Sequence, residues 1–262
     1  MNFVSEYIKY LVNAKGRHGI HSPFVYDLVD CCLQIRPDAD FSKDLQSLKK
    51  KLSKDLAEIE VQDAGAGSKT LGTRRRVNDI YRTASSKGVY ADLLYQLSNH
   101  YRPKRMLEFG TSLGIGTICL AAGNPTGSVV SVDACGETHK LAQTNISAFR
   151  LSNVRLINAT FSAFLEAHRA EDFDLIFIDG HHQGDALKKY VRQLLPFSNE
   201  NTIFVLDDIR WSKDMLDAWN ELKASSNFHV SLDLFRMGIL IRRPQQVKEH
   251  FVVKLKHVLR GF

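Results

Sequence analysis

The chain has 262 residues, of which 44% are hydrophobic and 24% are charged. These fractions exclude wholesale disorder, and the length allows one sizeable α/β core with an appended subdomain. Lys and Arg number 35 against 29 Asp and Glu. The net charge of +6 permits an anionic partner such as RNA or a nucleotide, but it is more typical of a solvated basic surface.

The cysteine pattern and the hydropathy indicate where the protein works. Four cysteines occur without a Cys-x-x-Cys spacing, which predicts neither a disulfide framework nor a zinc site and favours a reducing compartment. The first residues lack the pattern of a signal peptide, and no apolar run approaches the roughly 18 residues that span a bilayer. We therefore expect a cytoplasmic protein with no membrane partner.

The first part of the chain, to about residue 85, reads as helical and irregular. Gly16 can end a first helix, and Ser22 followed by Pro23 is typical of the capped start of a second. Residues 40–56 predict a third, highly charged amphipathic helix. The apolar face of the first helix would consist of Phe3, Ile8, Leu11 and Val12.

From about residue 86, short apolar runs alternate with helical patterns. This alternation predicts an α/β fold with a Rossmann-like, doubly wound sheet of seven mostly parallel strands, the last one antiparallel. The expected strands are 105–110, 128–134, 154–159, 173–180, 202–208, 229–236 and 237–243. The expected helices are 89–101, 114–123, 137–149, 161–169, 185–197 and 212–225.

Two glycine-rich stretches, residues 61–70 and 106–117, compete as the cofactor loop. Such a loop needs a buried strand before it, a helix after it, and an acidic side chain at the end of the next strand. The second stretch meets all three conditions, with Asp133 as the acid. The first stretch fails two of them and is predicted to be a connector in which Gly65 and Gly67 supply unusual backbone angles, or a mobile flap.

The second stretch departs from the dinucleotide pattern. Its glycines, Gly110, Gly114 and Gly116, do not follow the GxGxxG spacing. Glu108 precedes the first glycine by two residues. A carboxylate there is awkward beside a pyrophosphate but suits a ligand with a positive amino group.

Three aspartates end neighbouring strands of the predicted sheet. Asp179 follows one strand, and Asp207 and Asp208 follow the next. Because ligands of open parallel sheets bind at the carboxyl ends of the strands, these carboxylates should gather on one rim. They repel one another unless a cation or a proton intervenes, and hard oxygen ligands suit Mg²⁺. The alternative is that some of them cap the following helices.

Together, "LEFGTSLGIGT", Asp133, "FDLIFIDGHH" and "TIFVLDDI" resemble the class I S-adenosylmethionine-dependent methyltransferases. Within these the chain is similar to the small-molecule O-methyltransferases related to the catechol and caffeoyl-CoA enzymes. The resemblance covers about residues 85–243. It implies a methyltransferase domain at 86–262, preceded at 1–85 by a helical cap or lid that covers the acceptor pocket, forms a homodimer contact, or both.

The resemblance also implies the cofactor site. Asp133 would bind the ribose hydroxyls of S-adenosylmethionine, with Ala134 beside the adenine. Thr160 and Phe161 stand where the family has the end of a Gly-Asp-Ala, so the threonine hydroxyl would substitute for the usual polar contact and Phe161 would stack on the ring. Asp179 borders the site. The methionine part would be lined by Glu108, Gly110, Thr111, Ser112, Gly114 and Gly116.

For the chemistry, the resemblance implies a divalent metal. Asp179 and Asp207 match metal ligands of the metal-dependent enzymes, and Asp208 stands where they have an asparagine. Mg²⁺ would chelate the acceptor, lower the pKa of its hydroxyl and fix its orientation. His181 and His182 are candidate general bases beside Asp179, with His182 favoured because related sequences carry a histidine three positions after this aspartate.

Two other functions remain open at this point. An RNA methyltransferase is favoured by the net charge and by the run Arg74 to Arg76. A protein that binds the cofactor without catalysis is suggested by the altered loop at Thr160, although the complete acidic set argues against it. The methyl acceptor itself has no motif in the sequence.

Overall fold

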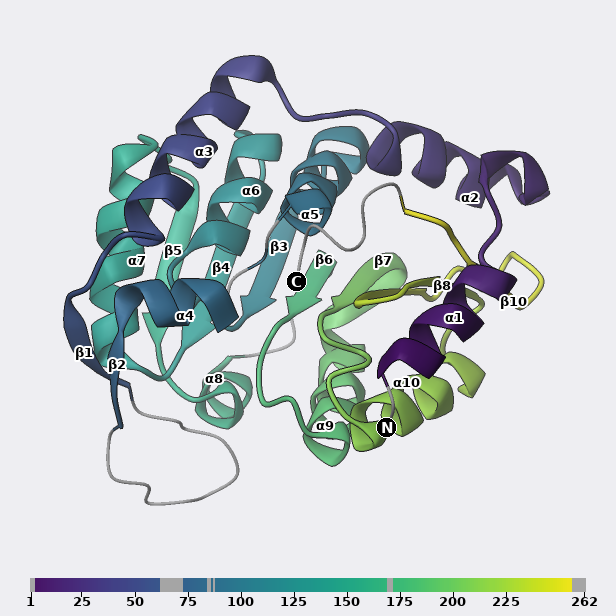
Figure 1. Ribbon diagram of the computed structural model, residues 1–262. Coiled ribbons are helices and arrows are strands. Elements are labelled where there is room, and N and C mark those ends of the chain that lie inside the picture. The colour runs from purple at the N-terminus through teal and green to yellow at the C-terminus, as the bar shows by residue number, and fades with distance from the viewer. Residues whose placement is uncertain (1–2, 62–72, 84–85, 87, 169–171, 256–262) are drawn as a thin grey trace.

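The computed structural model describes residues 3–61, 73–83, 86, 88–168 and 172–255 of the chain (Figure 1). Its centre is an eight-stranded sheet in the order β5-β4-β3-β6-β7-β9-β8-β10. The strands are β3 (Arg105–Phe109), β4 (Ser128–Asp133), β5 (Val154–Asn158), β6 (Phe173–Ile178), β7 (Ser198–Leu206), β8 (Val230–Leu234), β9 (Met237–Ile241) and β10 (Glu249–Val252).

The sheet is mostly parallel, which confirms the predicted fold class. β5, β4, β3, β6 and β7 pair in parallel, and β9 is antiparallel to both β7 and β8. The eighth strand, β10, pairs in parallel with β8 at the edge. It was not among the seven expected strands because only four residues form it and two of them are exposed.

Successive residues of the central strands point to opposite faces and enter two separate cores. Met106 and Phe177 belong to the larger core, whereas Leu107, Phe109 and Ile178 belong to the smaller one. The larger core is covered by α5 (Gly88–Tyr101), α6 (Ile115–Gly123) and α7 (Gly136–Ala148), and the smaller by α8 (Phe161–Ala167), α9 (Gly184–Leu194) and α10 (Lys213–Ala224). Helices on both faces make the sheet doubly wound.

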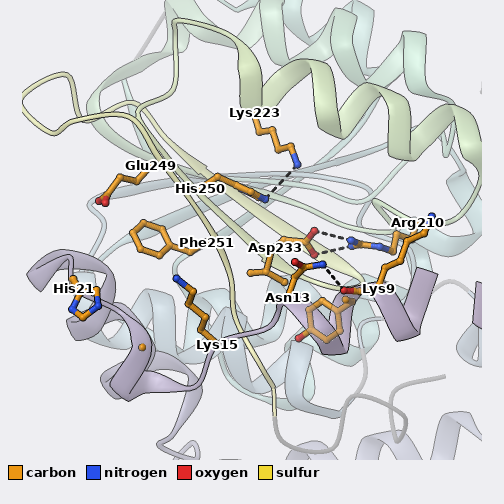
Figure 2. Close-up of a pocket in the computed structure, with 13 residues that line it drawn as sticks. Lys9, Asn13, Lys15, His21, Arg210, Lys223, Asp233, Glu249, His250 and Phe251 are labelled. Carbon is orange, nitrogen blue, oxygen red and sulfur yellow. Dashed lines mark hydrogen bonds and ion pairs between the residues drawn. The ribbon is translucent and has the colours of Figure 1, made fainter. Parts of the chain in front are cut away.

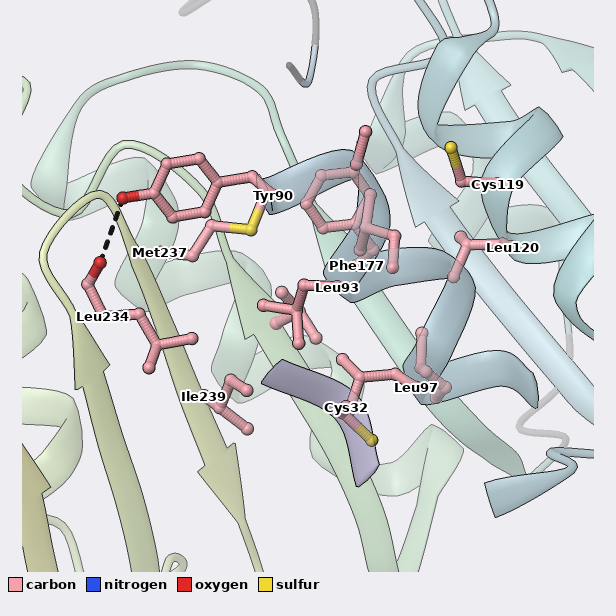
Figure 3. Packing of buried hydrophobic residues seen from close by; sticks show 14 of the residues in the cluster. Cys32, Tyr90, Leu93, Leu97, Cys119, Leu120, Phe177, Leu234, Met237 and Ile239 are labelled. Atoms are coloured by element: carbon pink, nitrogen blue, oxygen red, sulfur yellow. Dashed lines mark hydrogen bonds between the residues drawn. The ribbon is translucent and has the colours of Figure 1, made fainter. Parts of the chain in front are cut away.

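The larger core is shared between the N-terminal segment and the rest of the chain. Cys32 packs in one cluster with Leu93 and Phe177, and the Tyr90 hydroxyl donates to the Leu234 carbonyl at 3.0 Å (Figure 3). The segment comprises α1 (Phe3–Asn13), η1 (Arg17–Gly19), α2 (Pro23–Leu28), the π-helical turn η2 (Val29–Leu33), α3 (Ala39–Leu52) and α4 (Val77–Thr83). It is thus built against the sheet domain rather than apart from it.

The start of α2 follows the expected capping. The Ser22 hydroxyl accepts a hydrogen bond from the Val25 backbone N–H, and Pro23 stands at the first helical position. The η2 turn lies against α5, and Phe41 of α3 stacks on Tyr95 of α5 at 4.5 Å between ring centroids. In Figure 1 these helices run from the β5 end of the sheet across to α1, which lies beside β8 and β10.

The first helix forms where predicted but turns a different face inward. Ile8 and Val12 of the expected apolar face are 56% and 80% exposed. The buried residue is Tyr10, whose ring and that of Tyr7 pack on Phe235 at 5.2 and 5.0 Å. The Tyr10 hydroxyl donates to the Val253 carbonyl, which ties α1 to the residue that follows β10. Aromatic spacing, not aliphatic content, decides which face is buried.

The first glycine-rich stretch lies between two paired strands. β1 (Glu58–Val61) and β2 (Thr73–Arg76) form an antiparallel ladder, and residues 62–72, with Gly65 and Gly67, lie outside the described residues. In this ladder Glu58 faces Arg76 and Glu60 faces Arg74. The arginine run is exposed, and two of its three residues face glutamates across the strands.

Candidate active site

The carboxyl ends of β4, β3, β6 and β7 meet at one edge of the sheet, where the predicted site residues lie. The register pairs Phe109 with both Val132 and Ile178, and Ile178 with Leu206. The next residues along the chain therefore emerge side by side. They are Gly110, Asp133, Asp179 and Asp207.

Glycines are required in the loop after β3 because the chain passes too close for side chains. At Gly110 φ is +104°, and a Cβ would lie 1.8 Å from the Asp179 carbonyl oxygen. At Gly116 a Cβ would lie 2.3 Å from Oε1 of Glu108. Gly114, with φ of +83°, caps α6. The absence of side chains at Gly110 and Gly116 thus lets Asp179 and Glu108 lie close to the loop.

Glu108 is a buried carboxyl group at this loop, only 1% exposed. It accepts hydrogen bonds from the hydroxyls of Ser131, at 2.6 Å, and Thr117. Burial raises the pKa of Glu108 to about 7, against the opposing effect of these two hydroxyls. A buried acid that is half-ionised near neutral pH is well suited to meet a cationic group of a ligand.

Loop hydroxyls and Glu108 line a small cavity together with Asp179. The Oγ atoms of Ser86 and Ser112 are buried there and have no hydrogen-bond partner among the described residues. The Thr111 hydroxyl has a hydrogen-bond partner, since it lies 2.6 Å from the hydroxyl of Ser131. Buried hydroxyls left without partners indicate that a polar ligand completes the site.

Asp133 ends β4 and is partly engaged by the loops. Its carboxylate accepts from the backbone N–H of Ser112 at 2.8 Å and from that of Cys135 at 2.9 Å. Each carboxylate oxygen can accept a second bond, so Asp133 remains able to accept from the hydroxyls of a sugar. Ala134 lies half-buried in the turn that follows.

The loop after β5 is held by its own structure. The Thr160 hydroxyl accepts from the Ala163 N–H and so caps α8. Phe161 is buried, and its ring stacks on Phe109 at 4.4 Å with 5° between the planes. A Cβ on Gly180 would lie 2.8 Å from the same ring. Phe109 and Gly180 therefore pack against the Phe161 ring in the core. Little of the ring surface is left to stack on adenine, as the resemblance implies it would.

The structure separates the three aspartates into two groups. Asp207 is 2% exposed and lies against Arg236, whose Nε and Nη2 donate to its two oxygens at 3.1 Å each. The Asp208 backbone N–H donates to the same carboxylate at 2.8 Å. Asp207, predicted as a metal ligand, is therefore an ion-pair partner of Arg236 here.

The second group joins Asp179 and Asp208 to His182. One ligand atom from each of the three lies within 4.8 Å of the others. The Asp208 carboxylate is 3.6 Å from Nδ1 of His182 and 2.9 Å from Nε of Arg236. Two carboxylates and an imidazole form a donor set that a divalent cation can use.

The negative charge of the cluster of Asp179, Asp208 and His182 is only partly balanced by nearby positive charge. Burial, and then the nearby Asp207, raise the pKa of Asp208 to about 7, opposed by Arg236. Burial, Asp207 and Asp208 raise the pKa of Asp179 well above its ordinary value. The site therefore favours an added positive charge, either protons or a cation.

The two histidines after Asp179 take different positions. His182 lies beside Asp208, with its ring 5.3 Å from that of Trp211. His181 adopts a φ of 53°, and its ring packs on Tyr190 and Phe161. Of the two candidate bases, only His182 lies with the acidic residues.

A cavity of about 380 Å³ borders this group at Asp208. Asp208 and Arg236 form one wall. Aromatic rings of Phe3, Trp211 and Phe235 form others, and Trp211 is 61% exposed. An apolar pocket with a few charged groups is typical of a small-molecule site.

Sequence reasoning missed Arg236, Ser86 and Trp211. Arg236 lies in the turn between β8 and β9, 29 residues after Asp207, and no local pattern signals that it reaches back to the rim. Ser86 lies just before α5 and belongs to no motif in the sequence. Trp211 follows Asp208 closely, and an exposed tryptophan beside a strand-end aspartate is the one signal that was available.

Comparison with known proteins agrees with this geometry. Residues 107–209 match a protein family described as a methyltransferase domain. The fold is similar to that of a methyltransferase from Podospora anserina with S-adenosylhomocysteine bound, at 15% identity and a TM-score of 0.58, over 85% of this chain and 96% of that one.

Two O-methyltransferases are similar to the same degree. One is from Bacillus cereus, in complex with S-adenosylhomocysteine: 19% identity, TM-score 0.56, over 78% of this chain and 92% of that one. The other is TomG from Streptomyces achromogenes, involved in tomaymycin synthesis, in complex with S-adenosylmethionine: 16% identity, TM-score 0.54, over 82% and 95%. Residues 107–209 are thus similar to a methyltransferase domain, and the chain has the Rossmann-like methyltransferase fold. Within the described residues, no helix has the length and apolar character needed to cross a bilayer.

Proposed function

We propose that this methyltransferase transfers the methyl group of S-adenosylmethionine to a hydroxyl oxygen of a small molecule, with help from a divalent cation. One observation carries the proposal. Asp179 lines the cavity of the glycine loop with Glu108, and it also belongs to the cluster with Asp208 and His182. A cofactor bound at the loop would therefore end beside the acidic cluster, where an acceptor hydroxyl can be activated.

The residues of the glycine loop fit the cofactor. The Glu108 carboxylate would meet the amino group of its methionine part, and the free hydroxyls of Ser86 and Ser112 would gain partners. Asp133 would accept from the ribose hydroxyls, next to Ala134. The Thr160 hydroxyl accepts a bond from Ala163 but its own proton is still available, so it would donate a hydrogen bond to the adenine.

The cluster of Asp179, Asp208 and His182 would hold the cation. Its donor set suits Mg²⁺ or Mn²⁺. When bound, such an ion supplies a positive charge that lowers the pKa of an acceptor hydroxyl and fixes its position. Asp207 would support the site indirectly, by holding Arg236 beside Asp208. Without a cation, His182 oriented by Asp208 would act as the general base.

A small-molecule acceptor is favoured over RNA. The cavity beside Asp208 is bounded by aromatic side chains and suits a compact ligand. Two of the three arginines that favoured RNA, Arg74 and Arg76, face glutamates across the β1–β2 ladder. A salt-sensitive affinity for transfer RNA would reverse this preference.

We further propose a cytoplasmic protein that forms a homodimer through α1. All four cysteines are free thiols. The exposed apolar side chains of Ile8 and Val12 would be covered by a second copy. Sedimentation of the wild type and of Val12→Glu tests this point, because a protein that is monomeric at every concentration excludes the dimer.

Calorimetric titration with S-adenosylhomocysteine, in Mg²⁺ and again in EDTA, tests the function. We expect binding under both conditions, and a separate Mg²⁺ or Mn²⁺ binding heat that disappears in Asp179→Asn and Asp208→Asn. Asp185→Asn is the control, since this nearby carboxylate is 93% exposed. Binding of the cofactor product without any metal heat would assign activation to His182. No binding under either condition would refute the cofactor assignment.

A further inference from the structure

A second cavity lies away from the acidic cluster. It has a volume of about 570 Å³ and lies between α1, the segment around Lys15, α10 and the edge strand β10 (Figure 2). None of the residues assigned above to cofactor or metal lines it. Its walls carry four cationic side chains, Lys9, Lys15, Arg210 and Lys223, against the two carboxylates of Asp233 and Glu249.

Two of the cations are already compensated. Lys9 pairs with Glu6 at 2.7 Å. Arg210 donates through Nη1 and Nη2 to the two oxygens of Asp233, each at 2.7 Å. The Phe235 N–H also donates to Asp233. Asp233 is therefore paired directly with Arg210, and it acts on Lys223 only through its nearby charge, without a direct ion pair among the described residues.

Lys223 is half-buried and faces an imidazole instead of a carboxylate. Its Nζ lies 3.3 Å from Nε2 of His250, whose Nδ1 lies 2.9 Å from the Ser231 hydroxyl. Burial of the ring, with the Lys223 ammonium as the next cause, lowers the pKa of His250 to about 4. The imidazole is thus neutral at physiological pH, and burial lowers the pKa of Lys223 as well. A half-buried ammonium that forms no direct ion pair with a described residue is costly unless an anion joins it.

Lys15 supplies the second uncompensated charge. Its ammonium has no hydrogen bond or ion pair with any residue of the described ranges. Figure 2 shows Lys15 and Lys223 entering the cavity from different walls, with the ring of Phe251 on the side of Lys15 and the Glu249 carboxylate pointing away. Nε of Arg210 adds a buried donor without a partner in the described part of the chain.

We propose that this cavity binds a phosphate-bearing small molecule, with the phosphate between Lys15 and Lys223 and the rest of the ligand along Phe251. Two ammonium groups on different walls suit a dianion better than a single carboxylate. The site is separate from catalysis, although Arg210 also lines the cavity beside Asp208, so the ligand would lie one side chain away from the acceptor.

Calorimetric titration of the full chain with pyrophosphate tests the proposal, without and with S-adenosylhomocysteine to fill the glycine loop. We expect one saturable site in both titrations. Lys223→Met and Lys15→Met should each weaken binding about tenfold or more, because each removes a charge-assisted contact. Lys140→Met, which removes a 72% exposed lysine on α7, should bind as the wild type does.

Other results would overturn the proposal. One is the absence of saturable pyrophosphate binding by the wild type. The other is an affinity of Lys15→Met equal to that of the wild type. Because Lys15 is exposed, its replacement should not disturb folding, so this second test remains valid even if Lys223→Met does not fold. If a single-stranded RNA oligonucleotide displaces pyrophosphate and binds more tightly, the surface belongs to a nucleic-acid partner and not to a small molecule.

Discussion

The guanidinium of Arg236 spans the carboxylate of Asp207, with both oxygens bonded at 3.1 Å. Both side chains are buried, and Nε of Arg236 also lies 2.9 Å from Asp208. The protein thus carries one cation of its own at the acidic rim. Asp207 and Asp208 share it, so the three carboxylates Asp179, Asp207 and Asp208 together exceed its charge.

Replacing Arg236 should destabilise the fold strongly. Arg236→Met would leave Asp207 buried without its partner, and we expect the free energy of unfolding to fall by about 3–5 kcal/mol. Urea denaturation measures this loss. Asp207→Leu in the same chain should recover part of it, since the unpaired charge is then removed. A loss below about 1 kcal/mol in the single variant would mean that water reaches the pair and replaces it.

The pKa of Glu108 predicts how cofactor binding depends on pH. The raised value of about 7 applies to the free protein, and the amino group of a bound cofactor would favour the ionised form. Binding of S-adenosylhomocysteine below pH 7 should therefore release a proton, and its affinity should rise as the pH rises to about 7 and then level off. Calorimetry in buffers of different ionisation enthalpy counts the proton.

The stability of the free protein should show the opposite trend. Because the folded state holds the Glu108 proton more tightly than the unfolded chain does, this group favours folding most below its unfolded pKa, near 4.5. That contribution is lost as the pH rises through about 7. Glu108→Gln should abolish both the proton release and this part of the stability profile. Proton release that persists in the variant would assign the titration to another group.

The backbone contact at Gly110 predicts a selective intolerance. Gly110→Ala would place a Cβ 1.8 Å from the Asp179 carbonyl in a backbone region that alanine avoids. We expect a loss of about 2–4 kcal/mol in the free energy of unfolding and loss of S-adenosylhomocysteine binding. Gly16→Ala is the control, because no atom lies within 4 Å of its Cβ position. Equal stability of the two variants would show that the loop can move aside.

The rim could be predicted from the sequence because strand ends are local signals. A buried apolar run fixes where a parallel strand ends, and parallel strands end on one edge, so Asp133 and Asp179 were placed correctly from periodicity. The role of Asp207 could not be predicted, since it depends on Arg236 from a distant hairpin. The same holds for Phe161, whose neighbour Phe109 comes from another strand. Contacts between elements decide these roles, and spacing within an element does not reveal them.

Two helix caps can separate the structural role of Thr160 from its proposed contact with adenine. Thr160 caps α8 and Ser212 caps α10 in the same way, each accepting from the N–H three residues on. Thr160→Ala and Ser212→Ala should therefore each cost about 1 kcal/mol of unfolding free energy. Only Thr160→Ala should also weaken S-adenosylhomocysteine binding, and Thr160→Ser should restore it. If both alanine variants bind the ligand like the wild type, the adenine is held by other groups and Thr160 is only a cap.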